Sequence, residues 1–127
     1  MEVKQNELLL IFNSNNLYDR EARGYALSAY GNKLKTIDVA KEGFKGTLLV
    51  ELADKLGVPP EEMINQQSDV FKNEFEGKTS DKSGVLKMLS QRPEIMDTPI
   101  AVYSEKAEFI RSSYEFIPGG KKYNTGV

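Results

Sequence analysis

The apolar residues near the amino terminus form one short unbroken run. Leu8–Phe12 contains five apolar residues in succession, and four polar residues follow at 13–16. A continuous run of this length, ended by a polar cluster, is typical of a central strand that is buried on both faces. The pattern therefore predicts a strand at 8–12 with a polar loop directly after it.

The spacing of apolar residues then changes to that of a helix. Alanines and tyrosines recur at intervals of three and four, which predicts one packed helical face made of Tyr18, Ala22, Tyr25, Ala26, Ala29 and Tyr30. Asn15 or Asn16 can cap the first turn, and Asp19 suits that turn because a helix amino terminus favours negative charge. Gly31-Asn32 predicts the end of the helix.

A second strand and a series of helices are expected next. Residues 34–39 alternate and are rich in β-branched side chains, so strand, helix and strand form a parallel βαβ unit. Thr47 is expected to cap a helix that ends at Gly57. Three further helical segments are predicted, with starts at Pro59-Pro60, at Ser68-Asp69 and at Ser80 or Asp81, before Pro93.

The carboxyl-terminal part predicts a β-hairpin. Residues 98–103 form a turn into a strand, and 107–111 form its partner. A short helix is expected from Ser112 or Ser113, and residues 118–127 are expected to be a flexible tail. The element order predicts an α/β domain at 1–117 with a thioredoxin-like fold. Its central mixed four-stranded sheet is flanked by helices, with an all-helical insert between strands 2 and 3.

Composition restricts the chemistry more than the fold. The chain has 127 residues without cysteine or histidine, which excludes thiol and imidazole catalysis, disulfides and the usual zinc, copper and iron sites. A net charge of −2 gives no basic excess for nucleic-acid binding. The first apolar run is too short for a signal peptide or membrane span, so we expect a cytoplasmic protein with no membrane partner.

Four segments, in this order and spacing, carry a resemblance to a known family. The stretch 13–20 ends the first strand and leads to Arg20, and Glu51-Leu52 precedes Leu56-Gly57. The segments 63–72 and 93–100 complete the set. Over residues 7–117 the chain resembles the arsenate reductase (ArsC) and Spx group of thioredoxin-like proteins. The resemblance implies a nucleophilic cysteine at position 16, where this chain has Asn16.

The departures from the family pattern bear on activity. Reductases of this group attack arsenic with a thiolate, and an amide cannot replace it as nucleophile or redox group. Asn65 and Thr98 occupy two of the three positions where the family has arginines, and Arg111 matches the third. The resolving cysteine of Spx is absent too. The resemblance thus implies a reductase scaffold and argues against arsenate reductase activity, with no catalytic residue to name.

The candidate ligand-binding residues lie around the position of the missing cysteine: Asn16, Tyr18, Arg20, Asn65, Thr98, Pro99 and Arg111. Each has a plainer interpretation. Asn16 can simply cap the helix, Arg20 can pair with Asp19 or Glu21, and the tyrosines can pack against the sheet. The resemblance further implies a cis bond between Thr98 and Pro99 beside the site.

Two hypotheses of function follow. The first is a non-catalytic binding or regulatory module with a protein partner, as Spx-like proteins are. The second is a residual site for a small oxyanion or glutathione, or a thiol-independent enzyme in the same pocket. Neither needs a cofactor or a metal, apart from glutathione as a ligand. The sequence does not specify the oligomeric state.

Overall fold

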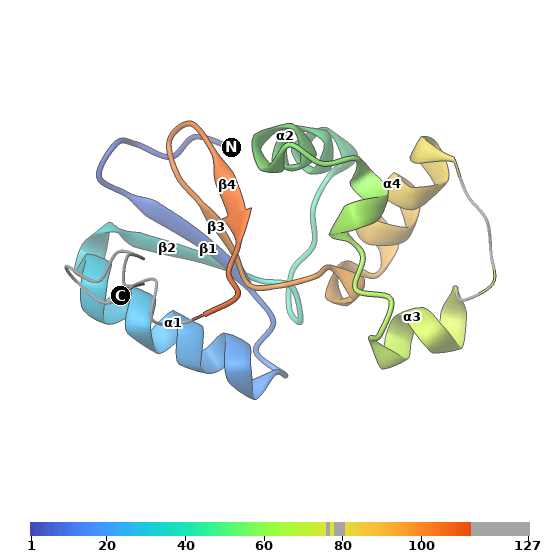
Figure 1. Ribbon diagram of the computed structural model, residues 1–127, viewed down its shortest axis with the longest axis horizontal. Coiled ribbons are helices and arrows are strands. Elements are labelled where there is room, and N and C mark those ends of the chain that lie inside the picture. The colour runs from blue at the N-terminus through green and yellow to red at the C-terminus, as the bar shows by residue number, and fades with distance from the viewer. Residues whose placement is uncertain (76, 78–80, 113–127) are drawn as a thin grey trace, which may run out of the picture.

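The computed structural model describes residues 1–75, 77 and 81–112. Figure 1 shows a sheet with helices on both sides and a helical region beyond one end of the sheet. The elements in chain order are β1 (Leu8–Phe12), α1 (Leu17–Tyr30), β2 (Leu34–Asp38), α2 (Gly46–Leu56), α3 (Asp69–Glu74), α4 (Lys82–Gln91), β3 (Ile100–Val102) and β4 (Ala107–Phe109). Short 3₁₀ turns lie at Gly31–Lys33, Pro60–Met63 and Pro93–Ile95.

The four strands form one mixed sheet in the order β2-β1-β3-β4. β1 runs parallel to β2 and antiparallel to β3, and β3 pairs antiparallel with β4. All five residues of β1 are buried, as expected for a central strand with helices on both faces. The predicted α/β fold, with its mixed sheet and its helical insert between the second and third strands, is confirmed.

Helix α1 covers one face of the sheet through small side chains. Ala22 and Ala26 are fully buried against residues of β1 such as Leu10. Tyr18 and Tyr25 are 37% and 39% exposed, so the prediction that they belong to the packed face is wrong. Alanines let the helix backbone approach the sheet closely, and the bulky tyrosine rings then fall on its outer flank.

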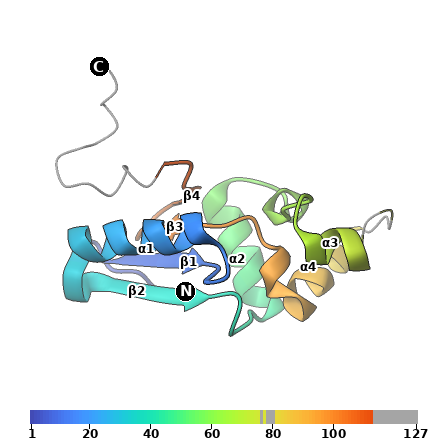
Figure 2. The same ribbon diagram turned by 90° about the horizontal axis from the view of Figure 1, so that it is seen from below.

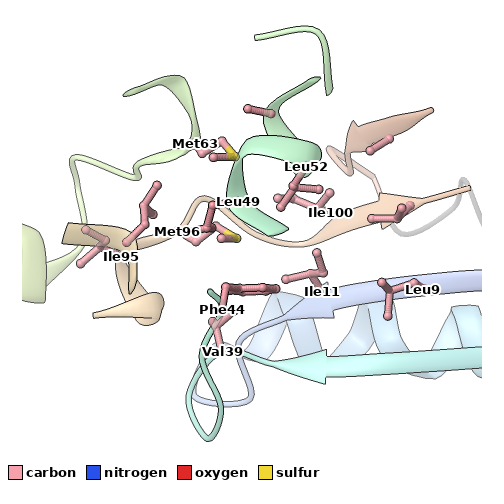
Figure 3. Close-up of a cluster of buried hydrophobic side chains, with 14 of the residues drawn as sticks. Leu9, Ile11, Val39, Phe44, Leu49, Leu52, Met63, Ile95, Met96 and Ile100 are labelled. Carbon is pink, nitrogen blue, oxygen red and sulfur yellow. The ribbon is translucent and has the colours of Figure 1, made fainter. Parts of the chain in front are cut away.

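The helical insert covers the other face. Figure 3 shows Leu49 and Leu52 of α2 packed near Ile11 of β1 and Ile100 of β3. Residues of α4 and of the 3₁₀ turns at Pro60–Met63 and Pro93–Ile95 extend this core past the end of the sheet, as Figure 2 shows for the insert as a whole. Since α3 contributes no buried residue, it lies at the margin of this core.

The helix ends follow local chemistry. Gly57 ends α2 in the left-handed conformation, with φ of 72°, as predicted for a C-cap glycine. The start of α2 differs from the prediction, because Thr47 is already inside the helix and is not its cap. The carbonyl of Lys45 accepts the first helical bonds from Leu48 and Leu49, so the cap lies two residues earlier than predicted and has no side-chain hydrogen bond.

The described part of the chain limits two further statements. The predicted helix from Ser112 or Ser113 and the tail at 118–127 concern residues that, Ser112 apart, lie outside the described ranges. Within the described ranges, no helix combines the length and the apolar character needed to cross a membrane.

Candidate functional site

The loop between β1 and α1 is organised by its asparagines. The Asn13 side-chain oxygen accepts a hydrogen bond from the Asn15 N–H at 2.9 Å, and the Asn16 N–H donates to the Asn13 carbonyl at 3.0 Å. The Asn16 side chain accepts from the Asp19 N–H at 3.4 Å, which makes Asn16 the N-cap of α1. Of the two asparagines that could cap this helix, the structure therefore selects Asn16.

A buried carboxylate lies directly behind this loop. Asp19 is 0% exposed, and its Oδ2 atom accepts from the Asn13 N–H at 2.9 Å and from the Thr98 hydroxyl at 2.5 Å. Among the described residues, its Oδ1 atom has no hydrogen-bond partner. Burial raises the pKa of Asp19, and the charge of Asp97 adds to this rise, although the bonds from Thr98 and Asn13 oppose it.

The segment before β3 carries two of the predicted residues. Thr98 reaches Asp19 through its hydroxyl, and Pro99 is buried. The Thr98–Pro99 peptide bond is cis. The Pro99 carbonyl accepts a hydrogen bond from the Ile110 N–H at 2.9 Å, which fixes this turn against the chain after β4. Residues from α1 and from the end of the hairpin thus meet at one short segment.

Arg111 and Asn65 approach the same segment from two other sides. Arg111 donates from Nη2 to Asp97 Oδ2 at 3.2 Å, and its guanidinium lies 4.9 Å from the centroid of the Phe109 ring. The Asn65 N–H donates to the Ile95 carbonyl at 2.8 Å, and the Asn65 side-chain oxygen accepts from the Gln67 N–H. Both predicted residues therefore already have partners within the protein.

Arg20 lies on a different side of the loop. Its Nη1 donates to the Ser14 carbonyl at 2.8 Å, and the ion pair with Asp19 or Glu21 that was considered from the sequence does not occur among the described residues. Arg20 lines a pocket of about 390 Å³ whose walls do not include Arg111. Arg20 and Arg111 therefore do not converge on this pocket.

Asp38 holds the Ser14 side of the loop. Its Oδ1 accepts from the Ser14 N–H and the Ala40 N–H, each at 3.0 Å. Burial by itself would raise the pKa of Asp38. The hydrogen bonds from Ser14 and Ala40 and the charge of Lys41 outweigh burial and hold this pKa below its ordinary value. Asp38 is therefore a charged anchor for the loop.

The predicted residues form two groups. Asn16, Thr98 and Pro99 are connected through Asp19, and Asn65 and Arg111 flank the same segment, whereas Arg20 turns away and Tyr18 lies on the exposed flank of α1. The sequence analysis missed Asp38 and Asp97 and gave Asp19 only a role in the first turn. Their carboxylates bind groups far away in the sequence, which no local pattern indicates. Asp38 binds the Ser14 N–H, Asp19 binds Thr98 and Asp97 binds Arg111, at separations of 24, 79 and 14 residues.

The carboxylates of this site hold the loop at 13–16 and the segment before β3 in place. No thiol or imidazole exists in the chain, and no group of three acidic side chains in the described residues is placed to hold a metal ion. Asp19, a buried carboxyl with a raised pKa, already accepts two hydrogen bonds on one oxygen.

Comparison with known proteins gives a structural answer. Neither models of known protein families nor curated proteins match the sequence. Solved structures do match. A candidate arsenate reductase from Yersinia pestis is 17% identical with a TM-score of 0.74, and the match covers 86% of this chain and 96% of that one.

Two other solved structures agree with the first. An arsenate reductase from Vibrio cholerae has 18% identity and a TM-score of 0.72, covering 89% of this chain and 97% of its own. An arsenate reductase (ArsC) related protein from Brucella melitensis has 18% identity and a TM-score of 0.65, covering 87% and 91%. At these identities the likeness shows the fold. The chain therefore has the thioredoxin-like fold of arsenate reductase (ArsC) proteins, without any cysteine.

Proposed function

We propose that this protein is a non-catalytic binding module that uses an arsenate reductase scaffold to bind a protein partner. The observation that carries the proposal is Asn16. The resemblance places the nucleophile at this position, and here its side chain caps α1. A capping amide supplies no electrons and forms no covalent adduct with arsenic.

The charges around Asn16 support the same conclusion. A helix amino terminus attracts anions when its N–H groups are available. Here the carboxylate of Asp19 lies in the first turn and binds the Asn13 N–H, and Arg111 is paired with Asp97. A carboxyl group in the first turn and an arginine already paired with Asp97 both disfavour an incoming oxyanion. The site is thus filled by the protein's own groups.

An exposed apolar flank next to this site supports a protein partner. Leu17 is 62% exposed at the start of α1, beside Tyr18, and Tyr25 follows eight residues after Leu17. Tyr18 and Tyr25 are seven residues apart, about two helical turns, and therefore lie on one face of α1, which Leu17 adjoins at the start of the helix. Exposed aromatic and aliphatic side chains in one strip are typical of surfaces that bind other proteins.

The first test is turnover. The purified protein, supplied with arsenate, glutathione and glutaredoxin, is expected to produce no arsenite. The Asn16→Cys variant is expected to stay far below a reductase, because Arg111 stays paired with Asp97. Turnover by the unmodified protein would contradict the proposal and favour a thiol-independent enzyme, and glutathione binding that Arg111→Ala abolishes would favour the residual ligand site.

The second test concerns the partner. Affinity capture from cells grown under several conditions is compared between the unmodified protein, Leu17→Asp, and a control charge change of the same sign, Lys87→Glu, on the exposed side of α4. A protein that is lost with Leu17→Asp and kept with Lys87→Glu supports the proposed surface. Capture that recovers no protein under any condition contradicts a partner-binding role.

A further inference from the structure

A pocket of about 390 Å³ opens on the α1 face of the sheet, at the carboxyl ends of β1 and β2. Its lining includes Phe12, the last residue of β1, and Lys41 and Glu42, which follow β2. Its lining contains none of Asn16, Thr98, Pro99 and Arg111. It is therefore separate from the site around Asp19, although the two share the loop at 13–16. Its volume falls within the usual range for small-molecule sites, roughly 300–1,000 Å³.

Three cations line this pocket. Arg20 and Arg23 lie three residues apart on α1, so their side chains project from neighbouring positions of one helix face, and Lys41 comes from the segment after β2. The ion pairs found among the described residues include none of these three. The two guanidinium groups therefore differ from that of Arg111 in having no carboxylate partner in the described part of the chain, while the charge of Lys41 also acts on Asp38.

Local contacts hold both guanidinium groups in place. Arg20 uses one N–H to bind the Ser14 carbonyl at 2.8 Å, and the Arg23 guanidinium carbon lies 5.9 Å from the centroid of the Phe12 ring. A guanidinium has five N–H donors, so most remain for an oxyanion. Two arginines and a lysine with restrained positions match the donors that a phosphate group needs.

The remaining walls present acceptors. Asp38 is ionised and uses Oδ1 to bind two backbone N–H groups, while Glu42 and the Thr36 hydroxyl also line the pocket. These carboxylates would repel an extended polyanion and accept hydrogen bonds from hydroxyl groups. The pocket thus combines donors for one anionic group with acceptors for neutral polar groups.

We propose that this pocket binds a small phosphate monoester that carries several hydroxyl groups, such as a sugar phosphate. The phosphate group contacts Arg20, Arg23 and Lys41, and the hydroxyl groups face Asp38 and Glu42. The inference does not depend on the proposed protein partner, because the exposed strip that begins at Leu17 contributes no residue to this pocket.

The test is calorimetric titration of the purified protein with ribose 5-phosphate, beside ribose and inorganic phosphate. Ribose 5-phosphate is expected to bind, ribose is not, and inorganic phosphate is expected to bind more weakly than the ester. Arg23→Gln is expected to weaken the ester by about tenfold or more, because a charge-assisted hydrogen bond is lost. Lys41→Gln, in the segment after β2, provides a second variant of a cation that lines the pocket. Lys87→Gln on α4 removes the same charge elsewhere on the surface and is expected to leave the affinity unchanged.

Several results would overturn the inference. If titration with ribose 5-phosphate up to about 10 mM gives no binding heat, the pocket does not bind the ester with a meaningful affinity. Equal weakening by Lys87→Gln would indicate general charge attraction. Loss of binding with Arg111→Gln, without loss in Arg23→Gln, would place the ligand at the site around Asp19 and would count against the proposed function as well. Inorganic phosphate that binds as tightly as the ester would overturn the sugar phosphate assignment.

Discussion

Replacement of Thr98 by valine tests the contact between α1 and the segment before β3. Valine has nearly the same shape as threonine and lacks the hydroxyl that donates to Asp19. Asp19 is 0% exposed and would keep one donor, the Asn13 N–H. A hydrogen bond to a charged group typically contributes about 1.5–3 kcal/mol, so we expect Thr98→Val to lower the free energy of unfolding by about 2 kcal/mol near neutral pH. That is a large share of the roughly 5–15 kcal/mol that a domain has in total.

The pH dependence of this loss has a definite sign. Burial raises the pKa of Asp19 above its ordinary value, and the Thr98 hydroxyl opposes this rise. A carboxyl whose pKa is raised by folding stabilises the protein fully below the unfolded pKa and loses this contribution as the pH rises through the folded pKa. Without the hydroxyl the pKa rises further, so the deficit of the variant is expected to grow as the pH rises through the folded pKa of Asp19 in the unmodified protein. At lower pH the protonated carboxyl needs its donor less, and the deficit is expected to shrink to about 1 kcal/mol or below.

The assay is urea unfolding followed by circular dichroism at several pH values, with the difference between variant and unmodified protein taken at each one. Thr36→Val makes the same change at an exposed position of β2 and is expected to alter stability by at most about 0.5 kcal/mol. In an Asp19→Asn background, Thr98→Val is expected to have less effect. A loss that is the same at every pH and in both backgrounds would refute the role assigned to the Asp19 charge.

Three further changes give measurable outcomes in the same unfolding assay. Asn16→Ala is expected to cost about 1 kcal/mol because it removes the α1 cap, whereas Asn15→Ala is expected to stay within about 0.5 kcal/mol, and equal losses would contradict the assigned cap. Gly57→Ala is expected to lower the free energy of unfolding by about 1–2 kcal/mol, because Gly57 has a φ of 72°. Gly24→Ala inside α1 is expected to raise it by up to about 1 kcal/mol, because an added Cβ there meets nothing within 4 Å. Asp38→Asn is expected to lower the free energy of unfolding by about 1–2 kcal/mol at neutral pH and by less in acid. The reason is that a carboxylate whose pKa is lowered by folding loses its contribution as the pH falls through the folded pKa. A loss that does not depend on pH would contradict this.

The sequence predicted the parts of the fold that depend on local chemistry. The unbroken run of β1 identified a strand with two covered faces, and Gly57 and Pro93 marked where helices end. Asp81 and Ser68 were correctly named as possible starts, since each caps its helix with its own side chain. The start at Thr47 was wrong because any residue before a helix can offer its carbonyl, as Lys45 does, and such a start has no composition of its own.

The site was harder to predict because its contacts are long-range. Asp19 was placed in the first turn on electrostatic grounds, and it does lie there, but nothing near it in the sequence indicates that its carboxylate turns inward to Thr98, 79 residues away. Arg111 was chosen by its likeness to a family position, and the pattern gave no sign that Asp97 neutralises it. A helical period identifies a face, and it does not tell whether tyrosine or alanine will be the residue that touches the sheet.

The marginal position of α3 has a consequence for how the protein opens. Because α3 buries no residue, its amide protons are expected to exchange with solvent through local fluctuations that leave the rest of the fold intact. The segments 63–65 and 95–97 of the insert differ from α3, since the Asn65 N–H is bound to the Ile95 carbonyl and the Asp97 N–H to the Met63 carbonyl, next to fully buried side chains. Those two amides are expected to exchange only when the whole domain unfolds. Within the insert, the amides of α3 are thus expected to exchange rapidly, and those of Asn65 and Asp97 as slowly as the amides of the sheet.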